Sequence, residues 1–297
     1  MKHFLPKFVK SIHFKMEVLK SKAELEKYIQ EVKKNGKTIG FAPTMGALHR
    51  GHISLYEAAR KNNDIVISSI FVNPTQFNNP DDLQKYPRTV ERDLKMLEES
   101  GLVDAVYVPS VEDMYPNGAE SKHYEFDGLE TEMEGKSRPG HFDGVGTVVE
   151  ELFRQVQPDD AYFGEKDFQQ LAIIKKLVEK LELPIKIHGA PIYREENGLA
   201  MSSRNERLTP EQREAARLIH DTLVKVNDWF RIITIPEINQ RVKDIFEDAE
   251  GFVLEYFTIA DESTLKETDF FYKDKSFRAF IVVFAGEVRL IDNMHLD

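Results

Sequence analysis

The sequence predicts an α/β protein in which a domain built on a parallel sheet is followed by a smaller α+β domain. Apolar β-type runs at residues 38–42 and 64–72 flank a helical segment, and strand, helix and strand within about 35 residues form a βαβ unit. The run at 64–72 is apolar almost throughout, which is typical of a strand buried on both faces. The composition changes near residue 192, and this change predicts the second domain.

The bulk composition narrows the class of protein. The chain has 297 residues, enough for two domains, and its hydrophobic content of 41% allows a sizeable core. The net charge of −11 argues against a general nucleic-acid-binding surface, and the absence of cysteine excludes disulfides, thiolate nucleophiles and cysteine-ligated metals. No window approaches the ~18 apolar residues of a membrane span. We therefore expect a soluble, cytoplasmic protein that binds neither membranes nor nucleic acids.

The N-terminal 20 residues alternate between basic and apolar, so they lack the apolar region of a secretory signal. We interpret residues 1–15 as a disordered extension and Met16 as the functional start. A first exposed helix is expected at 21–35. The parallel-sheet domain is expected at 16–191 and the α+β domain at 192–297.

The stretch around the second helix carries the strongest functional signal. A strand at 38–42 leads through a loop at 43–50 into a helix that opens near Gly51. His49 and His52 lie where the loop becomes the helix, and a helix N-terminus offers unpaired N–H groups and a positive dipole end to a phosphate. The two imidazoles could hydrogen-bond to phosphate oxygens or protonate them.

The histidine pair also admits plainer interpretations. Neighbouring histidines at a helix start are often surface residues or caps. A zinc site is disfavoured, because the usual metalloprotease helix places its histidines four residues apart with a Glu between them, whereas Arg50 and Gly51 separate these two. The strand–loop–helix context favours a nucleotide, since open α/β sheets bind nucleotides there.

A polar, proline-rich segment at 73–89 follows the second strand, and a charged helix is expected at 88–100. Asn73, Gln76 and Tyr86 could make uncharged hydrogen bonds to a small polar ligand. An ordinary solvent loop is the alternative.

Residues 110–140 are expected to be irregular. The glycine-rich stretch at 135–146 carries Arg138 and His141, and it is typical of a mobile loop that brings a cation to an anionic ligand, or of a plain surface loop. An amphipathic helix is expected at 145–155.

A third polar cluster follows the next strand, where Gly164 allows a sharp turn into a helix. Lys166 at a helix start opposes the helix dipole unless it faces bound phosphate. Asp167 could cap the helix. Gln169 and Gln170 must point in different directions, so at most one of them is expected to face a site.

After a strand within 184–191, the segment at 194–209 offers two hydroxyls and a guanidinium at 201–204. Arginine suits multidentate phosphate recognition. The alternative is that Ser203 or Asn205 simply caps a helix. No serine lies in a G-x-S-x-G elbow, which disfavours a nucleophilic hydrolase.

The remaining chain predicts the small α+β domain. Amphipathic helices are expected at 209–231 and 236–250, and strands at 252–260 and 280–290.

Six motifs occur in order between about Met16 and Asn293: PTMGALHRGH (43–52), FVNPTQF (71–77), RPGHFDGV (138–145), YFGEKDFQQL (162–171), GLAMSSRN (198–205) and RLIDN (289–293). Many nucleotidyltransferases share H-x-G-H, whereas the complete set resembles the pantoate–β-alanine ligase family. The departures, namely the extra residues 1–15 and a diverged stretch at 263–278, leave these motifs untouched.

The resemblance implies a Rossmann-type nucleotidyltransferase domain followed by a C-terminal lid domain. It implies that ATP and Mg²⁺ activate (R)-pantoate as pantoyl adenylate, and that β-alanine then attacks to give pantothenate and AMP. It also implies a homodimer that forms through the N-terminal domain. Because acyl adenylates hydrolyse, water must be excluded, and the lid segment at 202–204 and the stretch around Arg138 are the candidate moving parts.

The resemblance also assigns roles to residues. His52, as proton donor, His49 and Lys166 are the expected catalytic residues, and Gln76 and Gln170 are expected to bind pantoate, with Gln76 also meeting β-alanine. The expected ATP-binding residues are Met45, Gly46, Ala47, Leu48, His49, Arg50, Gly51, His52, Gly164, Glu165, Lys166, Asp167, Tyr193, Met201, Ser202, Ser203 and Arg204. Asp167 is expected on the ribose and the Tyr193 backbone at the adenine. The Mg²⁺ ligands are left open.

Two other functions stay open at this point. A cytidylyltransferase-like enzyme of the same superfamily would release pyrophosphate without consuming β-alanine. A non-catalytic nucleotide-binding protein could keep the fold, although mere binding does not require both histidines.

Overall fold

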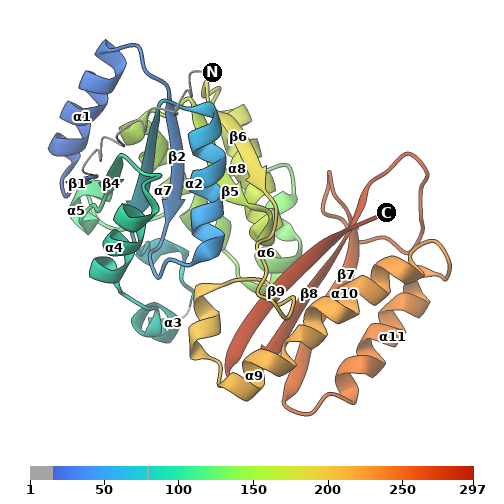
Figure 1. Ribbon diagram of the computed structural model, residues 1–297. Coiled ribbons are helices and arrows are strands. Elements are labelled where there is room, and N and C mark those ends of the chain that lie inside the picture. Colours follow the sequence, from blue (N-terminus) through green and yellow to red (C-terminus); the bar gives the residue numbers. More distant parts are fainter. Residues whose placement is uncertain (1–15, 79) are drawn as a thin grey trace, which may run out of the picture.

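The computed structural model describes residues 16–78 and 80–297, so the predicted extension at 1–15 lies outside the described residues. Figure 1 shows a larger α/β domain beside a smaller domain that is built on a separate antiparallel sheet. The fold class predicted from the sequence is confirmed.

The larger domain is built on six parallel strands in the order β1-β4-β3-β2-β5-β6. The strands are β1 (Glu17–Leu19), β2 (Ile39–Thr44), β3 (Ile65–Ile70), β4 (Ala105–Tyr107), β5 (Asp160–Gly164) and β6 (Lys186–Ala190). The strand order reverses between β2 and β5. In open α/β sheets, ligands bind outside the carboxyl ends of the strands at this reversal point, so the loops after β2 and β5 are the expected site.

Alternate residues of the central strands pack on opposite faces of the sheet. Phe41 of β2 and Ile67 of β3 belong to one core cluster, whereas their neighbours Ala42 and Val66 belong to another. Helices cover both faces (Figure 1). The first face carries α1 (Lys22–Lys34), α7 (His141–Val156) and α8 (Phe168–Lys180), and the second carries α2 (Arg50–Asn62) and α4 (Val90–Ser100). Burial on both faces explains why the strands are apolar almost throughout.

The predicted loop at 135–146 is wrong. Helix α6 (Met133–Ser137) occupies its start, and α7 already begins at His141. The glycines serve close packing: a Cβ on Gly144 would lie 2.5 Å from the Thr75 carbonyl oxygen, and one on Gly135 would lie 1.8 Å from the Glu130 carbonyl oxygen. Glycine enrichment therefore reflects close backbone approach here.

Further short helices connect these elements, so the stretch expected to be irregular at 110–140 is only partly so. They are α3 (Pro80–Lys85), α5 (Val111–Met114) and α9 (Pro210–Ala215), together with the 3₁₀ turns η1 (Pro74–Gln76), η2 (Leu129–Thr131), η3 (Glu165–Asp167) and η4 (Ser203–Arg207).

The smaller domain packs α10 (Arg217–Trp229) and α11 (Ile235–Glu247) on an antiparallel sheet. Its strands are β7 (Phe252–Asp261), β8 (Phe277–Ala285) and β9 (Val288–Leu296). The single strand predicted at 280–290 is wrong, because the chain reverses there between β8 and β9. Gly286, at a φ of +58°, supplies the left-handed backbone conformation of this turn.

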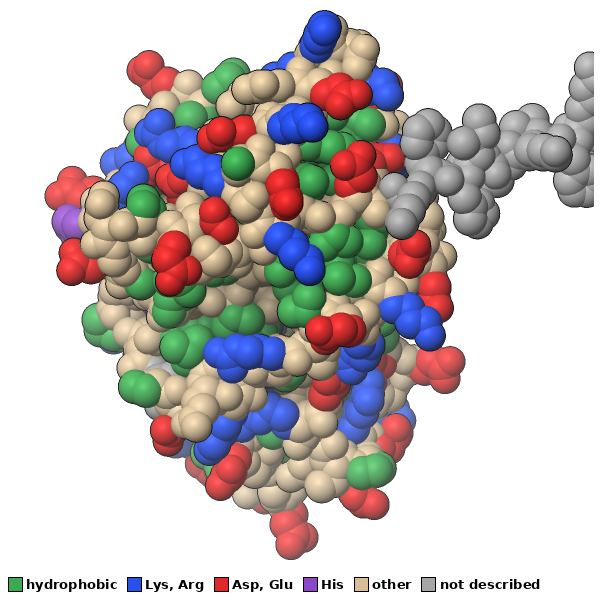
Figure 2. All heavy atoms as spheres, turned by 90° about the vertical axis from the view of Figure 1, so that its left-hand side faces the viewer, with side chains coloured by type: hydrophobic (Ala, Val, Ile, Leu, Met, Phe, Trp, Pro, Cys, Tyr) green, Lys and Arg blue, Asp and Glu red, His purple; other side chains and the backbone are tan. Residues whose placement is uncertain are grey.

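Surface charge and helix length are the two structural features that concern binding to nucleic acids and to membranes. Basic and acidic side chains are interspersed over the face shown in Figure 2. None of the helices within 16–78 and 80–297 has the length and apolarity needed to cross a membrane.

Candidate active site

A cleft lies where the two domains meet. It consists of two adjoining cavities of ≈ 240 and ≈ 510 Å³, and the smaller one opens at the carboxyl ends of β2 and β5. Five residues line both cavities: Lys166, Asp167, Gln170, Ser202 and Arg204. The topology of the sheet thus places the cleft at the point where the strand order reverses.

The two histidines face each other at the start of α2. The Nδ1 atom of His49 accepts a hydrogen bond from the Gly51 N–H at 3.1 Å, and the Nδ1 atom of His52 accepts one from the His49 N–H at 3.2 Å. The rings lie 4.1 Å apart, centroid to centroid. Because both Nδ1 atoms accept hydrogen bonds, each neutral ring carries its proton on Nε2.

Burial keeps both imidazoles neutral. It lowers the pKa of His49 to about 4, with the positive charge of Lys166 acting in the same direction. Burial, His49 and Lys166 together hold the pKa of His52 well below its usual value. At neutral pH the pair is therefore suited to donating hydrogen bonds from Nε2, whereas Lys166 and Arg204 bring positive charge to the smaller cavity.

A buried carboxylate shapes the histidine loop, residues 45–49. Asp93 of α4 is fully buried, and its carboxylate accepts hydrogen bonds from the N–H groups of Ala47 at 2.9 Å and Leu48 at 2.8 Å. Ala47 adopts a left-handed conformation with a φ of 50°. The role of Asp93 was not predicted from the sequence, because a charged residue in a charged amphipathic helix indicates a solvent-exposed position.

The structure brings most of the predicted site residues to the cleft. Those that line it are Met45, His49, Gly51, His52, Gln76, Gly164, Lys166, Asp167, Gln170, Tyr193, Met201, Ser202, Ser203 and Arg204. Asn73, Tyr86, Arg138 and His141 also line it.

Five predicted ATP-binding residues do not line either cavity, namely Gly46, Ala47, Leu48, Arg50 and Glu165. Ala47 and Leu48 turn into the protein, and each is 1% exposed. The Arg50 side chain points to solvent and pairs with Glu57 at 3.6 Å. The motif thus mixes residues that face the cleft with residues that shape the loop.

The lysine turn, residues 165–167 (η3), carries Lys166 into the cleft between β5 and α8. The Lys166 ammonium lies 3.9 Å from the Asp167 carboxylate. Asp167 occupies the N-cap position of α8, but its side chain makes no capping hydrogen bond, so the predicted cap is wrong. Its carboxylate instead faces the cleft.

The two glutamines after Phe168 make different contacts, but both line the larger cavity, so the prediction that at most one of them faces the site is wrong. Gln169 is buried and donates to the carbonyl oxygens of Leu129 and Glu132, both at 2.8 Å. Gln170 lines both cavities.

Gln76 is held at the smaller cavity by its neighbours. Its side-chain oxygen accepts from Asn73 at 3.1 Å. Its backbone carbonyl accepts from Arg138 Nη2 at 3.1 Å and pairs with His141 Nδ1 at 2.9 Å. Arg138 and His141 thus fix the turn that presents Gln76.

The segment at 201–204 joins the cleft from the side of the C-terminal domain. The Ser202 hydroxyl accepts from the Arg204 N–H at 3.2 Å, so Ser202 is the cap in place of the expected Ser203 or Asn205. Ser203 instead donates to the Ala47 carbonyl oxygen at 2.9 Å. This bond fastens the segment to the histidine loop.

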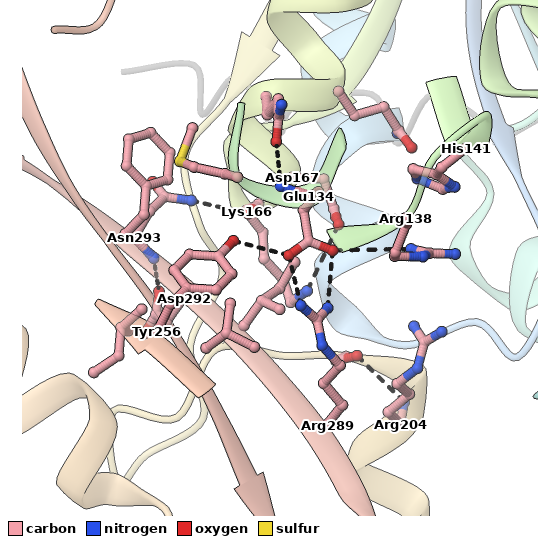
Figure 3. Close-up of a pocket in the computed structure, with 18 of the residues that line it drawn as sticks. Glu134, Arg138, His141, Lys166, Asp167, Arg204, Tyr256, Arg289, Asp292 and Asn293 are labelled. Carbon is pink, nitrogen blue, oxygen red and sulfur yellow. Dashed lines mark hydrogen bonds and ion pairs between the residues drawn. The ribbon is translucent and has the colours of Figure 1, made fainter. Parts of the chain in front are cut away.

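A carboxylate–guanidinium cluster, which was not predicted from the sequence, joins the two domains at the larger cavity of the cleft. Figure 3 shows Tyr256 and Arg289 of the C-terminal domain converging on Glu134 of α6. Arg289 donates two hydrogen bonds to Glu134, at 2.7 and 2.8 Å, and Tyr256 donates a third at 2.8 Å. Burial of Glu134 opposes ionisation, but the bonds from Arg289 outweigh it, so the pKa of this carboxyl lies below its usual value.

Comparison with known protein sequences agrees with this geometry. The family model for pantoate–β-alanine ligase matches residues 17–295. The pantothenate synthetase of Flavobacterium psychrophilum is 50% identical over 281 residues, which cover 95% of this chain and 100% of that protein. That of Christiangramia forsetii is 49% identical over 282 residues, which cover 95% and 100%.

Solved structures give the same result. Pantothenate synthetase from Thermus thermophilus superposes with a TM-score of 0.86 at 39% identity, covering 94% of this chain and 99% of that one. A pantoate–β-alanine ligase from Francisella tularensis, complexed with β,γ ATP and β-alanine, gives a TM-score of 0.78 at 37% identity, covering 94% and 97%. The chain therefore belongs to the pantoate–β-alanine ligase family.

Proposed function

We propose that the cleft carries out both steps of the ligase reaction of this family. In the first step a carboxylate oxygen of (R)-pantoate attacks the α-phosphorus of ATP, which forms pantoyl adenylate and releases pyrophosphate. In the second step the amine of β-alanine attacks the acyl carbon, loses a proton and displaces AMP, which gives pantothenate. Adenylation is needed because a free carboxylate would have to expel oxide.

One observation carries this proposal: groups from four separate segments meet in one cleft at the reversal point of the sheet. They are the imidazoles of His49 and His52, the ammonium of Lys166, the guanidinium of Arg204 and the carboxamides of Gln76 and Gln170. Positively charged and hydrogen-bond-donating groups suit a triphosphate, and neutral amides suit hydroxyl or carboxylate oxygens. Such a site accelerates phosphate chemistry mainly by positioning and electrostatics.

The geometry supports a role for each group. His49 and His52 donate hydrogen bonds from Nε2 to phosphate oxygens, and the bond from His52 stabilises the charge on the departing pyrophosphate. Lys166 and Arg204 neutralise the charge that develops on the phosphates. Gln76 and Gln170 hold pantoate and β-alanine.

The nucleotide itself is held by groups at the edge of the smaller cavity. Asp167 holds the ribose and the Tyr193 backbone holds the adenine. Both residues line that cavity.

The residues fit a Mg²⁺ ion that arrives with the nucleotide. No group of three or more His, Asp or Glu side chains within 16–78 and 80–297 is arranged to hold a metal. A site with one carboxylate, such as Asp167, suits Mg²⁺ because this ion keeps phosphate and water ligands. When bound, the ion neutralises phosphate charge.

Three coarser proposals accompany the reaction. The requirement for ATP points to the cytoplasm. We expect a homodimer that forms through the N-terminal domain. We place the boundary between the domains near residue 192, between β6 and the C-terminal core.

The test measures the first step alone. His52→Ala and Lys166→Ala should each lower pantoate-dependent ATP–pyrophosphate exchange by roughly 10² to 10³, since each group stabilises developing charge. His188→Ala removes a histidine of β6 outside the cleft and should leave exchange within about twofold of the unmodified protein. Full exchange by either cleft variant would refute the assigned roles.

A second assay follows the complete reaction. The unmodified protein should release AMP in a β-alanine-dependent manner. Pyrophosphate release without dependence on β-alanine would indicate nucleotidyl transfer to another acceptor.

A further inference from the structure

The RLIDN motif at 289–293 lies on β9 of the C-terminal domain, yet its last residue contacts the lysine turn. The Asn293 Nδ2 donates to the carbonyl oxygen of Glu165 at 2.9 Å and to that of Lys166 at 2.8 Å. Both protons of the carboxamide are therefore used on the two peptide groups that flank the Lys166 side chain. Figure 3 shows Asn293 on the β9 side of the cleft, near Lys166.

The carboxamide of Asn293 is fixed in this orientation. The residue is 2% exposed, and its Oδ1 accepts from Arg278 Nη1 at 2.6 Å. Since a guanidinium only donates, the oxygen must face Arg278 and the nitrogen must face the turn. Arg278 is itself held by Glu262 at 2.7 Å and stacks over Phe168, 4.0 Å from the ring centroid.

The backbone next to Asn293 is anchored as well. The Asn293 N–H donates to Asp292 Oδ1 at 2.8 Å, and both oxygens of that carboxylate accept from Arg194, at 2.6 and 3.1 Å. The donor that reaches the lysine turn is therefore rigidly supported. A rigid support is what a catalytic group needs when its position must be held within a fraction of an ångström.

We propose that Asn293 is a positioning residue for Lys166, through which the C-terminal domain sets the lysine at the phosphates. The proposal rests on the assignment of Lys166 to the phosphates in the proposed function. When β9 docks on the lysine turn, Asn293 clamps its two carbonyl groups and aims the Lys166 side chain into the cleft. When the domains separate, the turn loses this clamp. Docking of the domains and assembly of the adenylation site are thus one event.

The competing explanation is that Asn293 merely helps the domains adhere. The two explanations differ in how Asn293 depends on Lys166. A positioning residue acts through the lysine, so its removal should hardly lower the exchange rate further once Lys166 has been replaced. If Asn293 only stabilises the docked domains, its replacement should lower the exchange rate by the same factor in Lys166→Ala as in the unmodified protein.

The experiment uses Asn293→Asp, which keeps the shape of the side chain and the contact with Arg278 but loses both donors. Asn63→Asp is the matched control: Asn63 is buried outside the cleft, and its Nδ2 donates to the Ala59 carbonyl oxygen at 3.1 Å and to Tyr162 Oη at 3.0 Å. Both variants and Lys166→Ala are compared by ATP–pyrophosphate exchange. Asn293→Asp is also combined with Lys166→Ala.

Asn293→Asp should lower kcat for exchange roughly 10- to 100-fold, since small displacements of a catalytic group have effects of this size. The KM for ATP should change less than kcat, and Asn63→Asp should stay within about twofold of the unmodified protein. In the Lys166→Ala background, Asn293→Asp should lower kcat for exchange by less than about twofold. Asn293→Ala, which adds no charge, replaces the aspartate variant if near-ultraviolet circular dichroism shows that the latter is unfolded.

Two outcomes would overturn the proposal. One is exchange by the Asn293 variant equal to that of Asn63→Asp, and the other is an undiminished cost of the Asn293 change when Lys166 is already alanine. Full exchange by Lys166→Ala would instead refute the phosphate role of the lysine, so failure of the proposed function is seen separately.

Discussion

The histidine loop and the lysine turn follow neighbouring parallel strands, β2 and β5. The side chains that hold them in place come from different domains. The histidine loop after β2 is held mainly from within its own domain, where Asp93 binds the N–H groups of Ala47 and Leu48, and Ser203 of the C-terminal segment adds one bond to the Ala47 carbonyl oxygen. The lysine turn after β5 is held by Asn293 of the other domain. We therefore expect the positions of the imidazoles to depend less on docking of the domains than the position of the lysine does.

This difference suggests that the two turns act at different stages of the reaction. The preformed side offers neutral hydrogen-bond donors on a helix N-terminus, which suit nucleotide entry. The side that depends on the other domain carries the permanent charge of Lys166, which is needed when negative charge develops. A reactive acyl adenylate would then form only in a cleft from which water is excluded.

The largest effect should follow removal of the support on the histidine side. Asp93→Ala would leave two buried backbone N–H groups without acceptors, so we expect the free energy of unfolding to fall by about 2–5 kcal/mol. Urea denaturation measures this change. Thr89→Val is the control, because Thr89 only donates its hydroxyl to the same carboxylate, at 3.1 and 3.2 Å, and it should cost about 1 kcal/mol or less. Equal stability of the two variants would show that the loop does not depend on Asp93.

The two supports also differ in how far they could be predicted from the sequence. The βαβ pattern placed His49 and His52 after one strand, and the strand predicted to end at Phe163 placed Lys166 after another; the structure has them after β2 and β5. Asp93 binds a loop 45 and 46 residues away, and Glu134 pairs with Arg289 at a separation of 155 residues. No local pattern records such partners, because their burial is created only when the chain has folded.

Local composition was also misleading where glycine serves packing. Gly135 and Gly144 lie in helices at points of close backbone contact, although the same residues in sequence predicted a loop. The hairpin between β8 and β9 was missed because its two strands are apolar on both sides of a short turn. In each case tertiary packing decided the local structure.

A smaller effect should follow weakening of the contact between the domains. Glu134→Gln removes the charge that binds Arg289, while Arg289 keeps Glu255, which accepts at 2.6 and 3.0 Å. We expect a loss of roughly 1–2 kcal/mol in the free energy of unfolding, because a charge-assisted hydrogen bond becomes a neutral one. Small-angle X-ray scattering should show a larger radius of gyration for the ligand-free variant.

Glu255→Gln is the matched control for this prediction. It weakens a pair with the same arginine, but that pair lies within the C-terminal domain. Its radius of gyration should equal that of the unmodified protein. An increase of the same size in both variants would mean that Glu134 has no special part in holding the domains together.

The smallest expected effect concerns the charge state on the histidine side. The pKa of His49 is about 4 in the folded protein because of burial and Lys166, against an ordinary value of about 6.5 in the unfolded chain. As the pH falls below 6.5 the unfolded chain takes up a proton on His49 that the folded protein does not, so the contribution of His49 to stability declines between pH 6.5 and 4. His49→Asn keeps a capping residue at the start of α2 and should reduce the loss between pH 7.5 and 5.5 by roughly 1 kcal/mol.

The control for this last prediction is a histidine whose pKa is shifted in the opposite direction. His123 is exposed and pairs with Asp143 at 3.1 Å, which raises its pKa. The folded protein therefore binds this proton more readily than the unfolded chain, and His123→Asn should leave the acid loss unchanged or make it slightly larger. Urea titrations at the two pH values measure all three proteins. Identical acid losses in the His49 variant and the unmodified protein would mean that His49 titrates normally, and the histidine side would then carry positive charge below about pH 6.5.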